Sequence, residues 1–266
     1  MSTIGLIAGG GRFPLLLAES ARRAGHRVVA TGFVRQTLPE LEGSVDALTW
    51  VKLGEFGKIA AVLRQGGATE VVMLGGVAKV RFFRDAWLDA AGLKILAKVA
   101  VRSDDNLLRA IARWLDEQGL PVVDAAAFLQ DRLAPEGVLG RHQPGEGEWS
   151  DARYGLELAR GIGRLDLGQT VVVKDGVALA VEALEGTDAC IRRGGELAEG
   201  AVVAKAVKPQ QDRRFDLPAV GPDTVEVMRE VKARVLAVEA GATLVMDRDE
   251  MVRRADKAGV ALVGVR

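Results

Sequence analysis

The sequence predicts an α/β protein of two domains, the first built on a parallel sheet and the second an α+β domain with a mixed sheet. In the first half of the 266 residues, strand-like and helix-like segments alternate, which implies a parallel sheet flanked by helices. In the second half, two apolar runs meet at Asp175-Gly176, a strong signal for a β-hairpin and antiparallel pairing. Between the halves, residues 134–150 are rich in proline and glycine without apolar periodicity, which indicates a linker.

The elements of the first domain follow in order along the chain. A short apolar strand at 4–8 ends in three glycines, and Pro14 then opens a helix that Gly25 closes. We expect further strands at 27–33, 70–76 and 120–125, and further helices at 56–63 and 104–118. Residues 1–133 are therefore expected to form a Rossmann-like domain.

The second domain is expected to span residues 151–266. After the hairpin, a strand at 201–207 precedes a long helix at 224–240, for which Thr224 is the expected N-cap. A strand at 243–246, a helix at 248–258 and a strand at 260–265 complete the mixed sheet.

The composition argues against several classes of protein. Lysine plus arginine equals aspartate plus glutamate at 36 each, whereas a general nucleic-acid binder usually carries a basic excess. The single cysteine, Cys190, excludes an intrachain disulfide and fits a reducing compartment. The chain starts without the basic and small-residue pattern of a signal peptide, and no apolar run approaches the ~18 residues that span a bilayer. We therefore expect a cytoplasmic protein.

The two histidines, His26 and His142, limit the available chemistry. A zinc site built from several histidines is excluded, and one cysteine cannot replace a cysteine cluster. Acyl transfer by a Ser-His-Asp triad is disfavoured because the chain has no G-x-S-x-G elbow.

The first candidate site is the loop AGGGRFP (8–14), which lies between a strand and a helix. Main-chain N–H groups and the helix dipole favour an anion at such a place, and glycines let a phosphate approach the backbone. Pro14 occupies the place of the last glycine in the G-x-G-x-x-G fingerprint, and the second strand ends at Thr31-Gly32 without an acidic residue, so NAD binding is disfavoured. The alternative is a tight turn without a ligand.

Two further candidate sites follow in the first half. GGVAK (75–79) lies at a strand end, where open parallel sheets bind ligands if the strand order reverses there, and Lys79 would offer a point charge for a phosphate. In SDDNLLRA (103–110), Ser103 is a candidate cap and the helix dipole would stabilise Asp104. The functional alternative places Asp104 at a cleft shared with the second domain.

The segment 79–102 is basic and amphipathic, and it combines aromatic and aliphatic residues with lysines and arginines. Such a segment can lie on an anionic membrane or shelter acyl chains, and Lys94 and Lys98 would lie one helical turn apart. The alternative is ordinary core packing.

The richest candidate site is the segment 182–224, where carboxylates and cations alternate between short apolar runs. Carboxylates suit a hard metal ion and cations suit phosphate oxygens, whereas the alternative is a solvated, turn-rich loop. We expect its aspartates to lie in loops: Asp188, Asp212, Asp216 and Asp223. Its cations are Lys205, Lys208, Arg192, Arg193, Arg213 and Arg214.

Taken together, five segments resemble the LpxI type of UDP-2,3-diacylglucosamine pyrophosphatase. They are IAGGGRFP (7–14), GGVAK (75–79), DDNLLR (104–109), EALEGTDACIRRGG (182–195) and VKPQQDRRFDLPAVGPDT (207–224). The resemblance implies cleavage of UDP-2,3-diacylglucosamine to UMP and 2,3-diacylglucosamine 1-phosphate (lipid X) in lipid A synthesis. It also implies magnesium (Mg2+) as cofactor, attack by water on the phosphorus nearer the sugar, and work at the cytoplasmic face of the inner membrane.

The resemblance makes the aspartate of GPDT, Asp223, essential and places catalysis in the C-terminal domain. We expect Asp188 to share the catalytic and metal-binding role of Asp223. We expect substrate contacts from Gly10, Gly11, Arg12, Phe13, Lys79, Asp104, Thr187, Lys208, Gln211, Asp212, Arg213 and Thr224. We expect transient contact with the membrane surface and no nucleic-acid partner, and the oligomeric state, a homodimer included, is left open.

Two alternatives to the hydrolase remain open at this point. One is a nucleotide-dependent oxidoreductase, which the glycine-rich strand–turn–helix motivates. The other is a protein that binds a nucleotide sugar or lipid without turnover. Release of UMP from UDP-2,3-diacylglucosamine with magnesium would separate the hydrolase from both.

Overall fold

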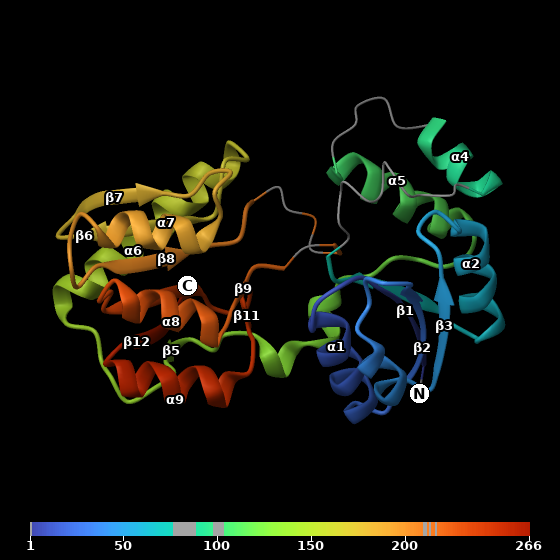
Figure 1. Cartoon of the computed structure of the whole chain (residues 1–266), viewed down its shortest axis with the longest axis horizontal. Helices are drawn as coiled ribbons and strands as arrows, with labels where there is room; N and C mark the ends of the chain where they lie inside the picture. Colours follow the sequence, from blue (N-terminus) through green and yellow to red (C-terminus); the bar gives the residue numbers. More distant parts are fainter. Residues whose placement is uncertain (1, 77–88, 98–103, 210–211, 213, 216) are drawn as a thin grey trace. The chain divides into compact units, whose positions relative to one another are not determined.

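The computed structural model describes residues 2–76, 89–97, 104–209, 212, 214–215 and 217–266. The chain forms two compact units (Figure 1). The N-terminal unit consists of Met1–Leu129 together with Asp212–Asp216, and the C-terminal unit consists of Gln130–Gln211 together with Leu217–Arg266. A short piece of the second half of the chain therefore belongs to the first unit.

The N-terminal unit is built on a four-stranded parallel sheet in the order β3-β2-β1-β4, which confirms the predicted parallel sheet. Its strands are β1 (Thr3–Ala8), β2 (Arg27–Phe33), β3 (Ala47–Val51) and β4 (Glu70–Leu74). Its α-helices are α1 (Phe13–Arg23), α2 (Phe56–Gln65), α4 (Ala90–Ala97) and α5 (Asp104–Glu117), and the 3-10 helices are η1 (Pro39–Ser44) and η2 (Ala125–Phe128). The strand order reverses between β1 and β4, so ligands are expected at the carboxyl ends of these two strands.

The helices of this unit bury apolar residues on the sheet. One core cluster joins Ile7, Val29 and Val71 of the strands to residues of α2, α4 and α5, and Phe215 packs against the same cluster. Helix α1 packs against β2 with η1 and η2, and Figure 1 shows α1 and α2 on opposite faces of the sheet. The contact of Phe215 explains why residues 212–216 belong to this unit.

Two details of this unit differ from the expectation. Strand β3 was not predicted, because its residues 47–51 are largely half-buried and lack a continuous apolar run. The expected strand at 120–125 is reduced to one bridge between Val122 and Val71. Pro121 has no N–H to continue a ladder, and Asp124 already starts η2 by accepting a hydrogen bond from the N–H of Ala126 at 2.8 Å.

The C-terminal unit is built on a six-stranded mixed sheet in the order β5-β12-β10-β8-β6-β7, as predicted for the second domain. Three central strands are parallel to one another: β8 (Val202–Lys205), β10 (Val235–Glu239) and β12 (Ala261–Val265). The other three strands are antiparallel to their neighbours: β5 (Gly137–Val138), β6 (Thr170–Lys174) and β7 (Val177–Val181). A separate pair joins β9 (Ala219–Val220) to β11 (Leu244–Val245). The predicted hairpin turns at Asp175 and Gly176, both with positive φ.

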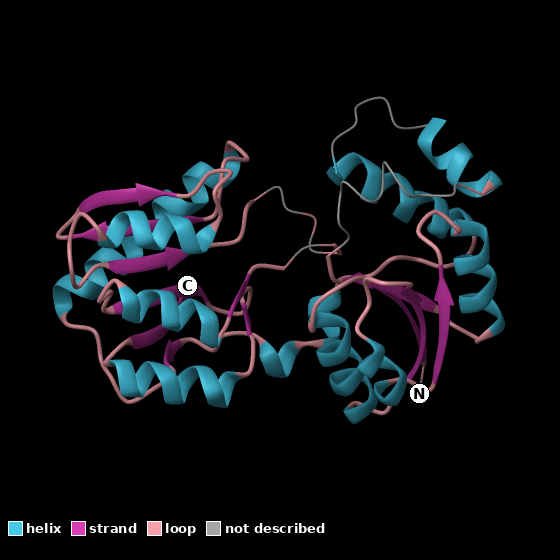
Figure 2. Cartoon of the chain, viewed as in Figure 1, coloured by secondary structure: helices cyan, strands magenta, loops and turns pink. Residues whose placement is uncertain are grey.

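Helices cover both faces of this sheet (Figure 2). Along β8, Val202 and Ala204 face the core beneath α6 (Glu146–Arg164), whereas Val203 faces the core beneath the other helices. Those other helices are α7 (Thr187–Gly195), α8 (Pro222–Glu230) and α9 (Arg248–Ala258). Because successive side chains of a strand point to opposite faces of the sheet, β8 contributes to the hydrophobic cores on both faces.

The range 134–150, expected as a linker, carries β5 and the start of α6. The 19-residue helix α6 was not predicted, because it contains several glycines. One of them is required by packing: a Cβ on Gly155 would lie 2.6 Å from Cβ of Ala204. Glycine here lets α6 approach the sheet closely and does not end the helix.

The expected helix at 224–240 is wrong. Helix α8 ends at Glu230, Lys232 adopts a left-handed conformation with φ of 55°, and β10 occupies 235–239. The run Val235–Val238 is fully buried, so the apolar pattern belongs to a central strand with both faces covered. Gly221, not Thr224, is the N-cap of α8. In contrast, the helix at 248–258 is confirmed.

None of the helices that the structure describes combines the length with the apolar composition that a bilayer span requires.

Candidate active site

The carboxyl edge of the N-terminal sheet is closed by backbone hydrogen bonds between the glycine loop and the end of β4. Gly9 N–H donates to the carbonyl of Leu74 at 2.8 Å, and Gly10 and Gly76 exchange two bonds of 2.7 and 3.0 Å. This edge lies at the reversal of strand order, as expected for residues 75–76. The N–H of Gly10 is therefore already bonded within the protein and is not left for a phosphate.

The glycines of this loop serve different purposes. A Cβ on Gly9 would lie 2.4 Å from the carbonyl oxygen of Gly75, so packing demands glycine there. Gly11 has φ of +86° and open space around the position of a Cβ. Gly11 and Arg12 are exposed and precede α1, which starts at Phe13. Gly9 and Gly10 therefore form a tight turn that binds no ligand through these backbone contacts. For the next residues, Gly11, Arg12 and Phe13, nucleotide binding stays a prediction.

Several predicted residues lie outside the described part of the chain. These are Lys79, Lys98, Gln211, Arg213 and Asp216, together with Phe82 and Trp87, two of the aromatic residues of the basic segment 79–102. Asp104 is the first residue of α5 in the N-terminal unit, and its role toward the second domain stays a prediction. Of the predicted lipid-binding segment, α4 is described: Ile95 is buried in the core cluster, whereas Leu93 is 60% exposed.

Asp212 binds arginines within the N-terminal unit. Its carboxylate accepts hydrogen bonds of 2.9 and 2.7 Å from Nε and Nη2 of Arg214, and Nε of Arg109 lies 3.8 Å away. The hydrogen bond from Arg214 lowers the pKa of Asp212. Since a guanidinium already occupies both oxygens, these bonds give Asp212 a structural role that holds the segment 212–216, and substrate contact stays a prediction.

The carboxyl edge of the C-terminal sheet gathers the N-termini of three helices. Strand β7 runs in the same direction as β8, β10 and β12, and α7 follows β7 directly. Helices α8 and α9 each precede a parallel strand, so they also begin at this edge. Free N–H groups and helix dipoles favour anions at helix N-termini. This edge can therefore attract phosphate.

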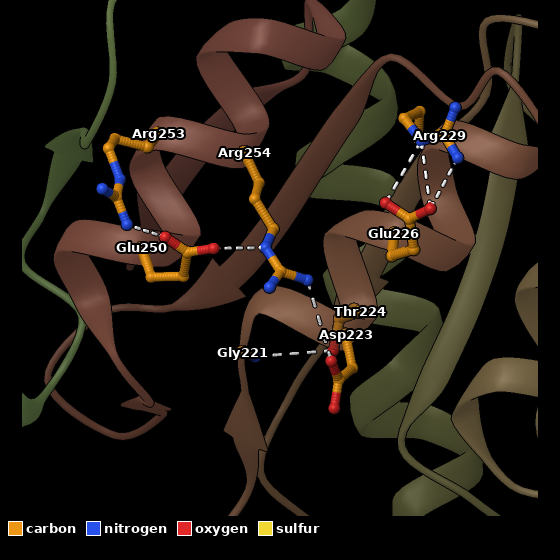
Figure 3. A network of polar contacts seen from close by, with 8 residues as sticks. All are labelled: Gly221, Asp223, Thr224, Glu226, Arg229, Glu250, Arg253 and Arg254. Atoms are coloured by element: carbon orange, nitrogen blue, oxygen red, sulfur yellow. Dashed lines mark hydrogen bonds and ion pairs between the residues drawn. The ribbon is translucent and has the colours of Figure 1, made fainter.

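Asp223 lies in the first turn of α8 at this edge, after Gly221 and Pro222. Its side chain is 101% exposed, and Nη1 of Arg254 from α9 lies 3.9 Å from Oδ1. Figure 3 shows Arg254 reaching from α9 toward Asp223, while its Nε donates to Glu250 at 2.6 Å. At 3.9 Å and in solvent, this ion pair is weak. The carboxylate is thus accessible to a metal ion or a water molecule.

Asp188 lies in the first turn of α7 and is exposed. Helices α7 and α8 pack against each other and begin at the same edge, but the separation of Asp188 from Asp223 stays a prediction. The expectation that these aspartates lie in loops is wrong for both, because each occupies a helical first turn. An acidic residue is favoured there by the helix dipole.

The residue before Asp188 is part of a buried polar cluster. Thr187 Oγ1 donates to Oε1 of Glu182 at 3.1 Å and accepts from Nζ of Lys205 at 3.2 Å. Glu182 and Lys205 are 7% and 8% exposed. Nothing in the sequence indicated the role of Glu182, because it follows an apolar strand without any motif that marks a buried carboxylate. The position of Arg254 beside Asp223 was likewise not predicted.

Two other predicted contacts have partners within the unit. Nζ of Lys208 donates to Oδ1 of Asp166 at 2.9 Å. Thr224 Oγ1 accepts from the N–H of Gly221 at 3.5 Å (Figure 3). These bonds fix the loop after β8 and the start of α8, and contact with substrate stays a prediction for both residues.

The donors of the C-terminal unit fit magnesium better than zinc. Within the described ranges, no three side chains of histidine, cysteine, aspartate or glutamate are placed to hold a metal ion together. Magnesium needs only one or two protein carboxylates when substrate phosphates and water complete its coordination. Asp223 and Asp188 are exposed, and magnesium binding by them stays a prediction.

The histidines and the cysteine do not belong to this site. His26 bonds with Oγ of Ser2 at 2.8 Å, and His142 bonds with the carbonyl of Asp256 at 2.9 Å. Burial raises the pKa of the Cys190 thiol to about 12, so it stays protonated at neutral pH and is a poor nucleophile. The chemistry of this edge therefore depends on carboxylates and cations.

Comparison with known proteins identifies relatives along the whole chain. Residues 3–132 match the model of the LpxI N-terminal domain, and residues 135–263 match that of the LpxI C-terminal domain. The UDP-2,3-diacylglucosamine pyrophosphatase LpxI of Caulobacter vibrioides is 37% identical over 277 residues, which cover 100% of this chain and 98% of the relative.

Solved structures show weaker similarity. Pyruvate carboxylase of Rhizobium etli is 14% identical with a TM-score of 0.30 over 49% of this chain and 12% of its own. N5-carboxyaminoimidazole ribonucleotide synthetase of Thermotoga maritima is 13% identical with a TM-score of 0.26 over 70% of this chain and 42% of its own. These similarities are too low to bear on this chain.

Proposed function

This chain belongs to the LpxI family, and we propose that it hydrolyses the pyrophosphate bond of UDP-2,3-diacylglucosamine in lipid A biosynthesis. The products are UMP and 2,3-diacylglucosamine 1-phosphate. The name of the Caulobacter vibrioides relative supports the substrate. The observation that carries the chemistry is the fully exposed carboxylate of Asp223, at the edge where α7, α8 and α9 begin.

Hydrolysis forms a bond between water oxygen and phosphorus and breaks the bridging P–O bond, so that UMP leaves as the phosphate monoester. We assign the non-bridging phosphate oxygens to main-chain N–H groups at the start of α7. At the start of α8, Pro222 has no N–H and the N–H of Thr224 donates to the carbonyl of Gly221 at 3.1 Å. The carboxylate of Asp223 orients the attacking water or accepts its proton. We assign the attack to the phosphorus nearer the sugar, which makes UMP the leaving group.

Magnesium fits this arrangement through Asp223 and Asp188, which would hold it. When bound, the ion supplies positive charge that neutralises phosphate oxygens as the P–O bond breaks. Arg254 lies 3.9 Å from Asp223, so its guanidinium would compete with the ion for that carboxylate.

We assign the uridine nucleotide to the carboxyl edge of the N-terminal sheet. Gly11 lies there in open space before α1, and Arg12 supplies an exposed cation. Pro14 lies in the first turn of α1 and has no N–H, so we assign the phosphate to the backbone around Gly11.

The acyl chains require an apolar surface or partial residence in the bilayer, at about 0.8 kcal/mol for each buried CH₂ group. We assign them to residues 82–101 at the cytoplasmic surface of the inner membrane. Lys94 of α4 would then face anionic head groups. The exposure of Leu93 supports this assignment, whereas the burial of Ile95 shows that part of α4 serves core packing.

The deciding experiment is incubation of the purified chain with UDP-2,3-diacylglucosamine, with magnesium and with EDTA. We expect UMP and the sugar 1-phosphate in equal amounts with magnesium and a large loss with EDTA. Reaction in H₂¹⁸O should place the label in the sugar 1-phosphate. Tight binding without UMP would favour a non-catalytic binder, and an NADH-dependent absorbance change would favour an oxidoreductase.

A further inference from the structure

Lys205, the last residue of β8, holds its ammonium group inside the C-terminal unit. The residue is 8% exposed. Nζ donates one hydrogen bond to Thr187 Oγ1 at 3.2 Å and another to the carbonyl oxygen of Ala219 at 3.0 Å. A lysine is almost never buried to this degree without partners, because the ammonium group loses its hydration. These two partners lie on two segments that this lysine holds.

The first partner, Thr187, links Lys205 to a buried carboxylate. An ammonium group has only donors, so the hydroxyl of Thr187 must accept from Lys205. Its own proton is then directed to Oε1 of Glu182 at 3.1 Å. Oε2 of Glu182 accepts from the N–H of Gln169 at 3.1 Å. Thr170 Oγ1 also lies 3.4 Å from Thr187 Oγ1, so hydrogen bonds to Lys205, Glu182 and Thr170 hold the first residue of α7.

The second partner, Ala219, begins β9, which leads through Gly221 into α8. Asp188 directly follows Thr187, and Asp223 lies four residues after Ala219. One buried ammonium group thus bonds to the segments that lead into both carboxylates of the candidate site. No other lysine among the residues that the structure describes is buried in this way.

We infer that Lys205 is a positioning residue that sets the starts of α7 and α8, and with them Asp188 and Asp223, relative to each other. This inference rests on the proposed function for its catalytic consequence. Lys205 is therefore assigned a positioning role and not a catalytic one, because its side chain is covered.

Helix stabilisation does not account for this lysine. A cation at a helix N-terminus is opposed by the helix dipole, which favours an anion there. Lys205 nevertheless bonds to the first residue of α7. A fixed positive charge beneath this edge adds to the field of the helix N-termini and favours a pyrophosphate above it. Position and charge thus both suit the proposed site.

The first test compares Lys205→Met with Lys174→Met. Lys174 ends the neighbouring strand β6 at the opposite edge of the sheet, and it pairs with exposed Asp175 at 3.6 Å. A misplacement of a reacting group by about 1 Å can reduce a rate about 100-fold. We expect Lys205→Met to lower kcat about 10- to 100-fold with KM changed less than about threefold, and Lys174→Met to leave both near the wild-type values. Rates are measured below the onset of thermal unfolding.

A second pair of variants covers the case in which Lys205→Met does not fold. Thr187→Val keeps the shape of the side chain and the charge of Lys205, but removes the hydroxyl that joins Lys205 to Glu182. We expect a loss of kcat similar to that of Lys205→Met. Thr187→Ser restores the hydroxyl, and we expect it to recover most of the lost rate. Equal kcat for the valine and serine variants would overturn the positioning role.

Hydrogen exchange of the free protein gives a readout that does not depend on activity. We expect Lys205→Met to speed amide exchange in the first turns of α7 and α8 but not in α9, and Lys174→Met to leave all three unchanged. Unchanged exchange together with unchanged kcat would overturn the inference. A wild-type chain that releases no UMP would instead overturn the proposed function, and faster exchange at α7 and α8 would still support the positioning role.

Discussion

The carboxyl edges of the two sheets both meet the N-termini of helices but differ in what occupies them. In the N-terminal unit, backbone hydrogen bonds close the edge, with Gly9 and Gly10 bonded to Leu74 and Gly76. In the C-terminal unit, the edge carries side chains: exposed Asp188 and Asp223 stand above buried Lys205 and Glu182. Parallel strands followed or preceded by helices bring helix N-termini to an edge in both cases. At the second edge, the first turns of α7 and α8 also carry exposed carboxylates.

This difference suggests a division of labour between the units. Glycines let backbone atoms approach each other or a ligand closely, which suits binding. Carboxylates at helix N-termini suit a metal ion and an activated water, which suits a reaction. We expect changes at the C-terminal edge to act on kcat, and changes at the N-terminal edge to act on stability or KM.

The largest effect is expected for Asp223→Asn, which keeps the shape of the side chain and removes its charge. We expect kcat to fall by about 100- to 10,000-fold, in the range of general-base loss, with little change in melting temperature because the side chain is fully exposed. The matched control is Glu226→Gln, which removes another carboxylate of α8 that binds Arg229 (Figure 3). An Asp223→Asn enzyme as fast as the control would remove the contrast between the edges.

The next effect is expected for Gly9→Ala, at the N-terminal edge. A Cβ there would lie 2.4 Å from the carbonyl oxygen of Gly75, so the loop and the end of β4 must move apart. We expect unfolding to become easier by roughly 1–3 kcal/mol, the usual cost of overpacking, measured by denaturant titration. Gly43→Ala provides the control, because open space surrounds a Cβ there. Equal stability of the two variants would mean that Gly9 is not needed for packing.

Gly11→Asn tests binding at the same edge without overpacking. Gly11 has φ of +86° and no neighbour near a Cβ, and asparagine tolerates positive φ better than other residues. We expect KM to rise several-fold, on the order of 1 kcal/mol of binding, with kcat nearly unchanged. A matched Gly25→Asn variant, also at positive φ in open space, should leave KM unaltered. If both variants raise KM equally, the loop does not bind the nucleotide.

The smallest effect is expected for Arg254→Gln. Exposed ion pairs contribute about 0–1 kcal/mol, so removing the cation 3.9 Å from Asp223 should free the carboxylate for magnesium. We predict that the magnesium concentration at half-maximal rate falls about two- to fivefold. Arg229→Gln removes the same charge from α8, where it binds Glu226, and should have no effect on this concentration. A weaker response to magnesium in Arg254→Gln would show that Arg254 supports the metal site instead of competing with it.

Much of the fold was predictable because it depends on neighbours in sequence. The strands at 27–33 and 70–74, the hairpin at Asp175-Gly176 and the helix at 248–258 all follow from local apolar period and turn residues. The segment around Asp223 was recognised from its order of residues, GPDT, which is again local information. These features need no knowledge of which distant residues come together.

What the sequence did not reveal depends on contacts between distant residues. The run 235–239 is a strand because β8 and β12 flank it, although its composition also suits a helix. Asp212 has a structural role because Arg109, more than 100 residues earlier, lies beside it. Gly155 packs against Ala204, and Lys205 is buried beside Thr187 and Ala219. The sequence by itself determined most of the element types and the family, and it singled out Asp188 and Asp223 as the carboxylates to test. The tertiary structure alone decided which polar groups are buried together, because burial and hydrogen bonding are properties of the assembled units and not of any short segment.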